Sequence, residues 1–286
     1  MQIKKTPFNS DVDTSKTTIN HLSLCSGYEG IGLGLRRIFK NIREVALVER
    51  EAFAISCLVK EMEKGRLDQA AIWSDIRTFP YRKFRGLVQI ASGGFPCAPF
   101  SNTGLRKSDR DERHIYPFIE FGIRECRPPI VFLENVEGII TTKTSEGEPV
   151  LKYVLRSLES MGYTAEAGIF SASEVGGGHQ RKRVFIMGYS NSEGLEGRDS
   201  KSLQELTSQF TSGETNTPRK VPAPINEPQY LWERPRTAPI KSCVDGRSYG
   251  VADRVDRTRL LGNGVFPRTA ERAFRILSKK LTERIK

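Results

Sequence analysis

The chain has 286 residues, of which 37% are hydrophobic and 28% charged, and its formal net charge is +11 at pH 7. This composition is that of a soluble globular protein, long enough for one large domain with a sizeable core, or for one domain and a smaller one. The positive charge favours a polyanionic partner, with a merely basic surface as the plainer alternative.

The cysteines and the apolar runs exclude several classes of protein. The five cysteines are Cys25, Cys57, Cys97, Cys126 and Cys243. They lie far apart without a C-x-x-C pair, and the three histidines do not pair with them, so neither a zinc site nor a disulfide framework is predicted. A reducing cytosol fits, and we expect a cytoplasmic protein. No apolar run is long enough to span a membrane, and the polar start, Met1–Asn20, predicts a flexible arm rather than a signal peptide.

A strand, a glycine-rich turn and a helix open the predicted fold. Leu22–Cys25 predicts a short strand, Ser26–Gly34 follows as the glycine-rich turn, and Leu35–Phe39 continues at helical spacing. This layout brings a nucleotide-like ligand against backbone N–H groups at a helix N-terminus. A plain tight connection is the more common interpretation of such a turn taken alone.

Acidic residues end the next two predicted strands. Arg43–Val48 predicts a strand that ends at Glu49, where a doubly wound fold presents an acid to ribose hydroxyls, and a solvated carboxylate is the alternative. A helix is expected from about Ala52 to Lys64, and the brief strand Ile72–Ile76 ends near Asp75. With the glycine turn, these strand ends predict half of a cofactor cleft.

The stretch Gly93–Ser101 organises the rest of the chain. The buried apolar run Leu87–Ala91 leads into it and predicts a parallel strand. Two glycines then allow close backbone approach, and two prolines stiffen the turn around Cys97. Open α/β sheets place their chemistry at such strand ends. The turn has two interpretations, a rigidly held nucleophilic cysteine or a buried structural one.

A polar, basic loop and a second candidate carboxylate follow. Asn102–Arg113 predicts a mobile loop beside the thiol, and Tyr116–Cys126 an amphipathic helix. Pro128–Leu133 predicts a buried strand that closes on Glu134. A carboxylate directly after such a run is a catalytic candidate, and a capping or surface acid is an equal alternative when Glu134 is considered alone.

Basic residues mark the last core strand. After the predicted helix Leu151–Met161 and strand Ala165–Phe170, Gly176–Arg183 leads into the strand Val184–Gly188. Its basic side chains suit contacts with phosphate or a base, with a solvated basic hairpin as the alternative.

The composition changes after this strand. From Asn191 to about Gly250 the chain is rich in Ser, Thr, Gly, Pro and charge, which predicts a second unit with little core of its own. Its candidate contact residues are Trp232, Arg234 and Arg236. Leu260–Pro267 then precedes an amphipathic helix that is expected to end at about Lys280.

Motifs in this order resemble the DNA (cytosine-5)-methyltransferase family of prokaryotic or phage type. They are G-F-P-C-A-P-F-S at Gly94–Ser101, E-N-V at Glu134–Val136, Q-R-K-R at Gln180–Arg183 and G-N-G-V at Gly262–Val265. The resemblance implies an α/β fold, a doubly wound, Rossmann-like S-adenosylmethionine-binding domain over residues 19–190. It also implies a small target-recognition domain inserted over residues 191–250, and a segment over residues 251–286 that rejoins the catalytic domain.

The resemblance implies methyl transfer from S-adenosylmethionine to C5 of a cytosine flipped out of DNA. Cys97 is similar to the thiol that adds to C6, which makes C5 enamine-like. Glu134 would contact N3 and the exocyclic amine, Arg183 would hold O2, and Arg181 would contact phosphate and support these groups. The loop after Cys97 would be the lid, and water is a candidate base for the C5 proton.

The resemblance also implies the cofactor site, and no metal. The predicted cofactor residues are Cys25, Ser26, Gly27, Tyr28, Gly30, Glu49, Arg50, Asp75, Ile76, Pro96, Asn263 and Val265. The departures from the family pattern are Ser23-Leu24-Cys25 for Asp-Leu-Phe, Glu29 for a glycine, Arg50 for an aromatic residue, Ala98 for Gln and Gly264 for Ala or Ser. They alter the cofactor pocket and leave the four catalytic candidates intact, so an active enzyme is expected.

The expected partner is double-stranded DNA, with a cognate restriction endonuclease as a further candidate, no membrane and a monomeric state. An RNA cytosine methyltransferase on the same domain is one alternative, although its Cys-Phe-Thr signature is not found here. A catalytically silent DNA-binding protein, with Cys97 merely structural, is another.

Overall fold

A mixed β-sheet forms the centre of the protein. The computed structural model describes residues 18–96, 115–177, 180–190, 260 and 262–285. Cys97, the loop that follows it and the segment 191–250 lie outside the described residues. Within them the sheet has seven strands in the order β3-β2-β1-β4-β5-β7-β6.

The strands and helices alternate along most of the chain, as the sequence predicts for an α/β fold. The strands are β1 Ile19–Leu24, β2 Ile42–Val48, β3 Ala71–Trp73, β4 Ile90–Gly94, β5 Ile130–Val136, β6 Tyr163–Ser171 and β7 Lys182–Ser190. The helices are α1 Gly30–Leu35, α2 Ala52–Glu63, α3 Tyr116–Cys126, α4 Val150–Ser160 and α7 Pro267–Ile285. Short 3-10 helices are η2 Tyr81–Phe84, η4 Glu137–Ile140 and η5 Ser173–Val175.

The sheet direction and order create a crevice. Strands β3, β2, β1, β4 and β5 are parallel, whereas β7 lies antiparallel between β5 and β6. The chain moves outward from β1 through β2 to β3, and then returns to β4 on the other side of β1. The connections therefore diverge at the carboxyl ends of β1 and β4, which is where doubly wound sheets bind ligands. This arrangement confirms the predicted Rossmann-like fold.

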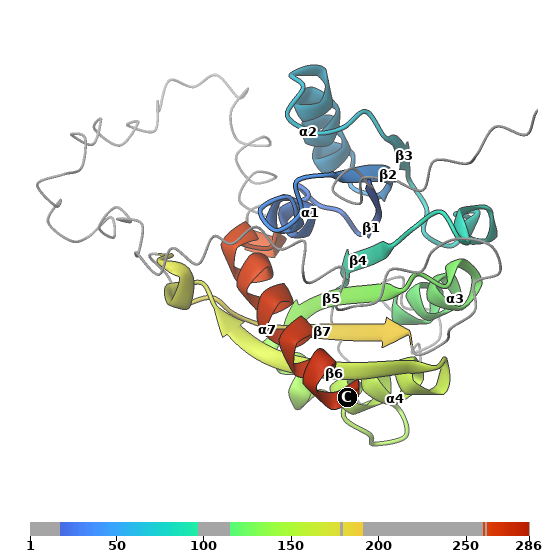
Figure 1. The fold of residues 1–286 in the computed structure, drawn as a ribbon, viewed down its shortest axis with the longest axis vertical. Coiled ribbons are helices and arrows are strands. Elements are labelled where there is room, and N and C mark those ends of the chain that lie inside the picture. Colours follow the sequence, from blue (N-terminus) through green and yellow to red (C-terminus); the bar gives the residue numbers. More distant parts are fainter. Residues whose placement is uncertain (1–17, 97–114, 178–179, 191–259, 261, 286) are drawn as a thin grey trace, which may run out of the picture.

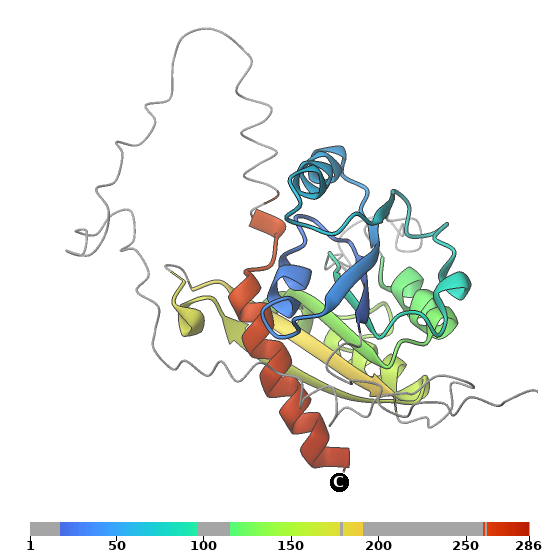
Figure 2. The same ribbon diagram turned by 45° about the horizontal axis from the view of Figure 1, so that its top comes forward.

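The central strands are buried on both faces, as their continuous apolar runs predict. Along β5, Ile130 and Phe132 join the apolar cluster of α1 and α7, whereas Val131 and Leu133 join that of α3 and α4. All four side chains are at most 1% exposed. Helices α1 and α7 thus cover one face of the sheet, and α3 and α4 cover the other (Figures 1 and 2).

Several predicted boundaries were wrong. Strand β1 begins at Ile19 instead of Leu22, and β6 and β7 extend beyond both of their predicted ends. The helix expected at Leu35–Phe39 is found at Gly30–Leu35, within the glycine stretch. Its first residue is Gly30, where a Cβ would overlap the Val265 carbonyl. The strand expected at Leu87–Ala91 begins at Ile90, and Gly93 and Gly94 are its last residues rather than a turn. The last helix continues to Ile285 because apolar residues as far as Leu281 pack on the sheet.

Other expectations agree closely with the structure. The helix Tyr116–Cys126 is found with the predicted bounds, β2 and α2 differ from the prediction by one residue at one end, and α4 differs by one residue at each end. The brief strand near Trp73 ends before Asp75. In the described part of the chain, no helix combines the length and the apolar character needed to cross a membrane.

Candidate cofactor and catalytic site

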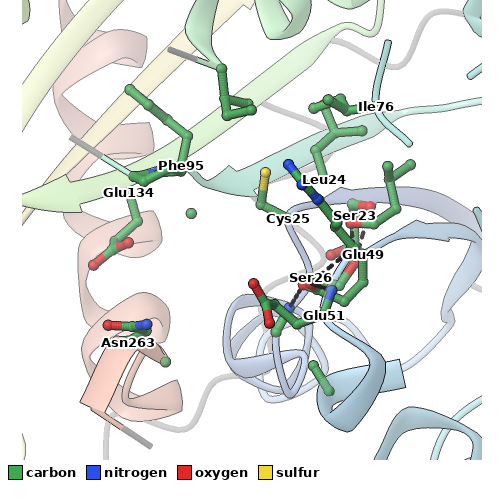
Figure 3. A pocket seen from close by; sticks show the side chains of 18 of the residues that line it. Ser23, Leu24, Cys25, Ser26, Glu49, Glu51, Ile76, Phe95, Glu134 and Asn263 are labelled. Carbon is green, nitrogen blue, oxygen red and sulfur yellow. Dashed lines mark hydrogen bonds between the residues drawn. The ribbon is translucent and has the colours of Figure 1, made fainter. Parts of the chain in front are cut away.

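A cavity of about 1010 Å³ opens at the carboxyl ends of the strands (Figure 3). One wall, here called the glycine-turn wall, consists of Ser23–Gly27, Gly30 and Glu49–Glu51. The facing Glu134 wall consists of Gly94–Pro96, Glu134, Arg183 and Asn263–Val265. Figure 3 shows Glu134 and Asn263 on one side, and Ser26, Glu49 and Glu51 on the other. The volume suits a nucleotide-sized ligand.

The predicted cofactor residues lie together around this cavity, with one exception. Every one except Tyr28 is among the residues that line it. The phenol of Tyr28 donates a hydrogen bond to the Val265 carbonyl, so this side chain joins the two walls. The roles of the predicted cofactor residues in binding a cofactor stay predictions.

Glu49 holds the glycine turn in place. It directly follows β2, is 8% exposed, and accepts a hydrogen bond from the backbone N–H of Gly27 at 2.7 Å. Its other oxygen accepts from the backbone N–H groups of Arg50 and Glu51, each at 2.8 Å, just before α2 begins. A merely solvated carboxylate is therefore the wrong interpretation of Glu49.

Cys25 is unsuited to nucleophilic attack. Burial, followed by the neighbouring charge of Glu49, raises the pKa of its thiol to about 12. A thiol with such a pKa remains protonated at neutral pH, and the thiolate is the reactive form. The cavity therefore gains no nucleophile from Cys25, although this residue lines it.

Asp75, which lines the cavity, pairs with Arg77. The Arg77 guanidinium donates to both of its oxygens, with Nε–Oδ1 at 2.9 Å and a terminal nitrogen–Oδ2 distance of 2.8 Å. These hydrogen bonds lower the pKa of Asp75, so it stays ionised. An ionised carboxylate at this edge offers an acceptor to an amine or a hydroxyl group.

Glu134 is buried and faces the cavity from the end of β5. Its Oε1 lies 2.9 Å from Nε of Arg183, and the side chain of Glu134 is 6% exposed. Burial raises the pKa of Glu134 to about 7, while Arg183 and Arg181 oppose this shift. The group can therefore exist in both protonation states near neutral pH. A surface or capping acid is the wrong interpretation of Glu134.

The sheet explains how these groups meet. In the antiparallel pair of β5 and β7, Arg183 lies opposite Val136, so its guanidinium reaches back to Glu134. In the parallel pair of β4 and β5, Gly94 lies beside Glu134, and a Cβ there would come within 3.1 Å of Oε2. The glycine leaves open space between the end of β4 and the carboxylate.

Arg181 contacts the C-terminal segment rather than the cavity. Its terminal nitrogen donates to the Gly264 carbonyl at 2.6 Å. Its buried Nε has no hydrogen-bond partner among the residues that the structure describes. Burial, followed by the repulsion of Arg183, lowers the pKa of Arg181. Among the basic residues of this stretch that the structure describes, only Lys182 fits the solvated-hairpin alternative, with a side chain that is 51% exposed.

The sequence analysis did not predict the following two contacts. Buried Asn135 donates from Nδ2 to the Phe95 carbonyl at 3.0 Å, which ties the end of β5 to the segment just before Cys97. The E-N-V motif contains this signal, but its asparagine received no role. Separately, a Cβ on Gly264 would overlap the ring of Tyr28, which explains the glycine at this position.

Comparisons with known proteins agree with this geometry. Residues 19–240 match the family model described as C-5 cytosine-specific DNA methylase. The chain is 30% identical over 170 residues to the type II methyltransferase M.NgoMIV of Neisseria gonorrhoeae, which covers 59% of this chain and 51% of that one. It is 30% identical over 167 residues to the type II methyltransferase M.CviJI of Paramecium bursaria Chlorella virus IL3A, covering 58% and 42%. The chain thus spans about half the length of the curated relatives it matches.

Solved structures share the fold. S. pombe Dnmt2 methyltransferase superposes with a TM-score of 0.50 at 22% identity, covering 62% of this chain and 52% of that one. A Spodoptera frugiperda DNMT2 mutant gives a TM-score of 0.51 at 19% identity, covering 64% and 54%. These likenesses support the fold alone. The family match, over most of the chain, shows that this protein belongs to the C-5 cytosine-specific DNA methylase family.

Proposed function

We propose that the protein is a DNA (cytosine-5)-methyltransferase that uses S-adenosylmethionine and a covalent bond between Cys97 and cytosine C6. The observation that carries the proposal is buried Glu134, paired with Arg183 in one cavity with the glycine turn. Family membership supports the same reaction. Cys97 lies outside the described residues, and Phe95 and Pro96, which lead to it, line the cavity.

The glycine-turn wall and the cavity residues beside it fit S-adenosylmethionine. Glu49 and Asp75 offer carboxylate oxygens to hydroxyl and amine donors, while Ile31 and Ile76 offer apolar surface to an adenine ring. The open backbone around Gly27 lets a ligand approach closely. When bound, this cofactor supplies an electrophilic methyl group. The roles of the individual residues toward it are part of the proposal.

The Glu134 wall fits the cytosine. As the Cys97 thiolate adds to C6, electron density moves to N3, and protonated Glu134 gives N3 its proton. Arg183 would hold O2 and, as the partner of Glu134, would accommodate the carboxylate left behind. After methylation, C5 loses its proton to water, the bond from C6 to Cys97 breaks and N3 returns its proton to Glu134, which restores the ring.

DNA is the proposed macromolecular substrate. C5 is inaccessible in a stacked duplex, so the target base must be flipped into the cavity. The net charge of +11 suits the phosphate backbone. We place the catalytic domain at residues 19–190, target recognition at 191–250 and the returning segment at 251–286. The packing of α7 on α1 and β6 supports this return. A monomeric state, a cytoplasmic location and a cognate restriction endonuclease stay predictions.

A direct assay tests the proposed function. The purified full chain is incubated with S-adenosylmethionine and either duplex DNA or tRNA, and the methylated nucleoside is identified by mass spectrometry. We expect 5-methylcytosine in DNA from the wild type and none from Cys97→Ser, because a hydroxyl is a much weaker nucleophile than a thiolate. Methylation of tRNA alone, or of another atom of the base, would contradict the proposal.

A further inference from the structure

A buried glutamate lies beneath the glycine turn and outside the cavity. Glu29 precedes the first residue of α1 and has φ of 66°, a conformation that glycine adopts more readily than other residues. The residue is 1% exposed. The hydroxyl of Ser23, at the end of β1, donates to Glu29 Oε2 at 2.7 Å. The side chain therefore links the start of α1 to the strand from which the turn emerges.

The space for this carboxylate is built into the fold. A Cβ on Gly32 would overlap Glu29 Oε1, so the glycine leaves the room that the side chain occupies. His21 Nδ1 lies 3.7 Å from Oε1, and neither atom has a hydrogen-bond partner among the residues that the structure describes. On its other side, His21 Nε2 forms a 2.7 Å hydrogen bond with Ser92. Glu29 is thus held between α1 and β1, and His21 connects it to Ser92 of β4.

The surrounding charges form an ion-pair network. His21 Nδ1 is 3.8 Å from Glu44 Oε1, and the Arg36 guanidinium binds both oxygens of Glu44 as well as Asp68. The donor atoms of His21, Glu29 and Glu44 lie within 4.8 Å of one another, a spacing that a metal ion could use. Because Arg36 already pairs with the Glu44 carboxylate, only His21 and Glu29 would remain as metal ligands. A structural metal site needs about four ligands.

The glycine turn is consequently held from two strands. Glu49 holds Gly27 from β2, and Glu29 holds the start of α1 to β1 through Ser23. Gly27, Gly30 and Ser23 line the cavity, so a shift at either anchor would displace this wall of the cavity. Ser23 and Glu29 occupy the positions where the family resemblance has Asp and Gly. Both patterns therefore place one carboxylate between the end of β1 and the start of α1. The family pattern carries it at position 23, and this protein carries it at position 29.

We propose that Glu29 is a positioning residue for the cofactor turn, and that the Ser23–Glu29 pair replaces an Asp–Gly pair in this role. The proposal rests on the proposed use of S-adenosylmethionine. Glu29 does not touch the ligand in this account. It fixes the backbone of Gly27 and Gly30 by anchoring α1 to β1, and its hydrogen bond compensates for a left-handed conformation that glycine would adopt without cost.

Calorimetric titration of S-adenosylhomocysteine into the full chain tests this role. Glu29→Gly should weaken binding at least about tenfold, although glycine relieves the positive φ, because the anchor is lost. Glu29→Gln, whose amide oxygen still accepts from Ser23, is the conservative control and should stay within about threefold of wild type. Ser23→Asp alone should weaken binding, since two carboxylates would then face each other. Combined with Glu29→Gly, it should restore affinity to within about threefold.

Two further readouts separate positioning from simple stability. Thermal unfolding reports the stability of each variant, and amide hydrogen exchange reports the protection of residues 26–33 without ligand. If Glu29→Gly lowers the unfolding temperature but leaves both affinity and exchange unchanged, the proposal is wrong. Failure of the double variant to restore affinity and protection would also overturn it. If the wild type binds no S-adenosylhomocysteine, the proposed function fails, while exchange over residues 26–33 still decides whether Glu29 anchors the turn.

Discussion

Glu134 and Glu29 are buried carboxylates with similar acidity and different surroundings. Burial raises the pKa of each to about 7. Glu134 faces the cavity beside Arg183, whereas Glu29 lies outside it and accepts a hydrogen bond from Ser23. A raised pKa is thus shared by a candidate catalytic group and a candidate anchor. The two roles differ in where the side chain faces and in which residue it contacts, whereas the pKa values are alike.

The largest expected difference between these glutamates concerns turnover. Glu134→Gln should lower the kcat of DNA methylation by about 10²–10⁴, because the amide cannot protonate N3. It should leave the affinity for S-adenosylhomocysteine within about threefold of wild type, because the glycine-turn wall is unchanged. Initial rates with tritiated S-adenosylmethionine give kcat.

Glu29→Gln is the matched control for that change, since it neutralises the other buried glutamate. Its kcat should remain within about threefold of wild type, because Glu29 does not face the cytosine in this account. Equal losses of kcat in the two variants would remove the distinction between a catalytic carboxylate and an anchor.

Both glutamates should make stability depend on pH in the same direction. In the folded protein their pKa is about 7, above the ordinary value of 4.5, so the folded state binds more protons between these values. The free energy of unfolding should therefore fall as pH rises through this window and level off above it. Each group contributes at most about 3 kcal/mol.

Urea unfolding of the apo protein at a series of pH values between about 5 and about 8 measures this dependence. Glu29→Gln and Glu134→Gln should each reduce the slope, and the double variant should reduce it further. A slope unchanged in Glu29→Gln would show that this carboxyl titrates normally, in conflict with its burial.

The contact between the two walls should produce a smaller effect. Gly264→Ala should destabilise the protein by about 1–3 kcal/mol, because its Cβ would overlap the ring of Tyr28. Gly262→Ala is the control, since no atom of the described residues lies within 4 Å of a Cβ there. Thermal unfolding measures both changes.

A compensating substitution sharpens this test. Combining Tyr28→Ala with Gly264→Ala should recover part of the loss, because the overlap disappears. If the two glycine variants lose the same stability, or if the combined variant is no better than the sum of its single changes, the steric explanation for Gly264 fails.

The sequence predicts the fold well where its signals are local. Continuous apolar runs identified the strands that are buried on both faces, and the ends of those runs placed Glu49 and Glu134 at the cavity. The apolar run of β7 did not indicate that this strand is antiparallel. A strand buried on both faces has the same continuous apolar pattern whether it is parallel or antiparallel to its neighbour. Gly93 and Gly94 were assigned to a turn because a glycine pair in an extended segment leaves no apolar pattern.

The contacts that sequence analysis missed join distant parts of the chain. Tyr28 and Val265 are 237 positions apart, and the Asn135 contact with Phe95 spans 40. The exchange of Ser23 and Glu29 was visible as two separate departures from the family pattern. The fold of the turn, which brings the hydroxyl onto the carboxylate, shows that they form one pair.

Covalent trapping tests the central claim most directly. Duplex DNA that contains 5-fluorocytosine at a methylated site is incubated with the wild type and S-adenosylmethionine, and the adduct is analysed by denaturing electrophoresis and peptide mass spectrometry. Fluorine cannot leave C5 as a cation, so elimination should stop and DNA should remain bonded to the peptide that contains Cys97. An adduct on another residue, or no adduct on a sequence that the enzyme does methylate, would contradict attack by Cys97 at C6.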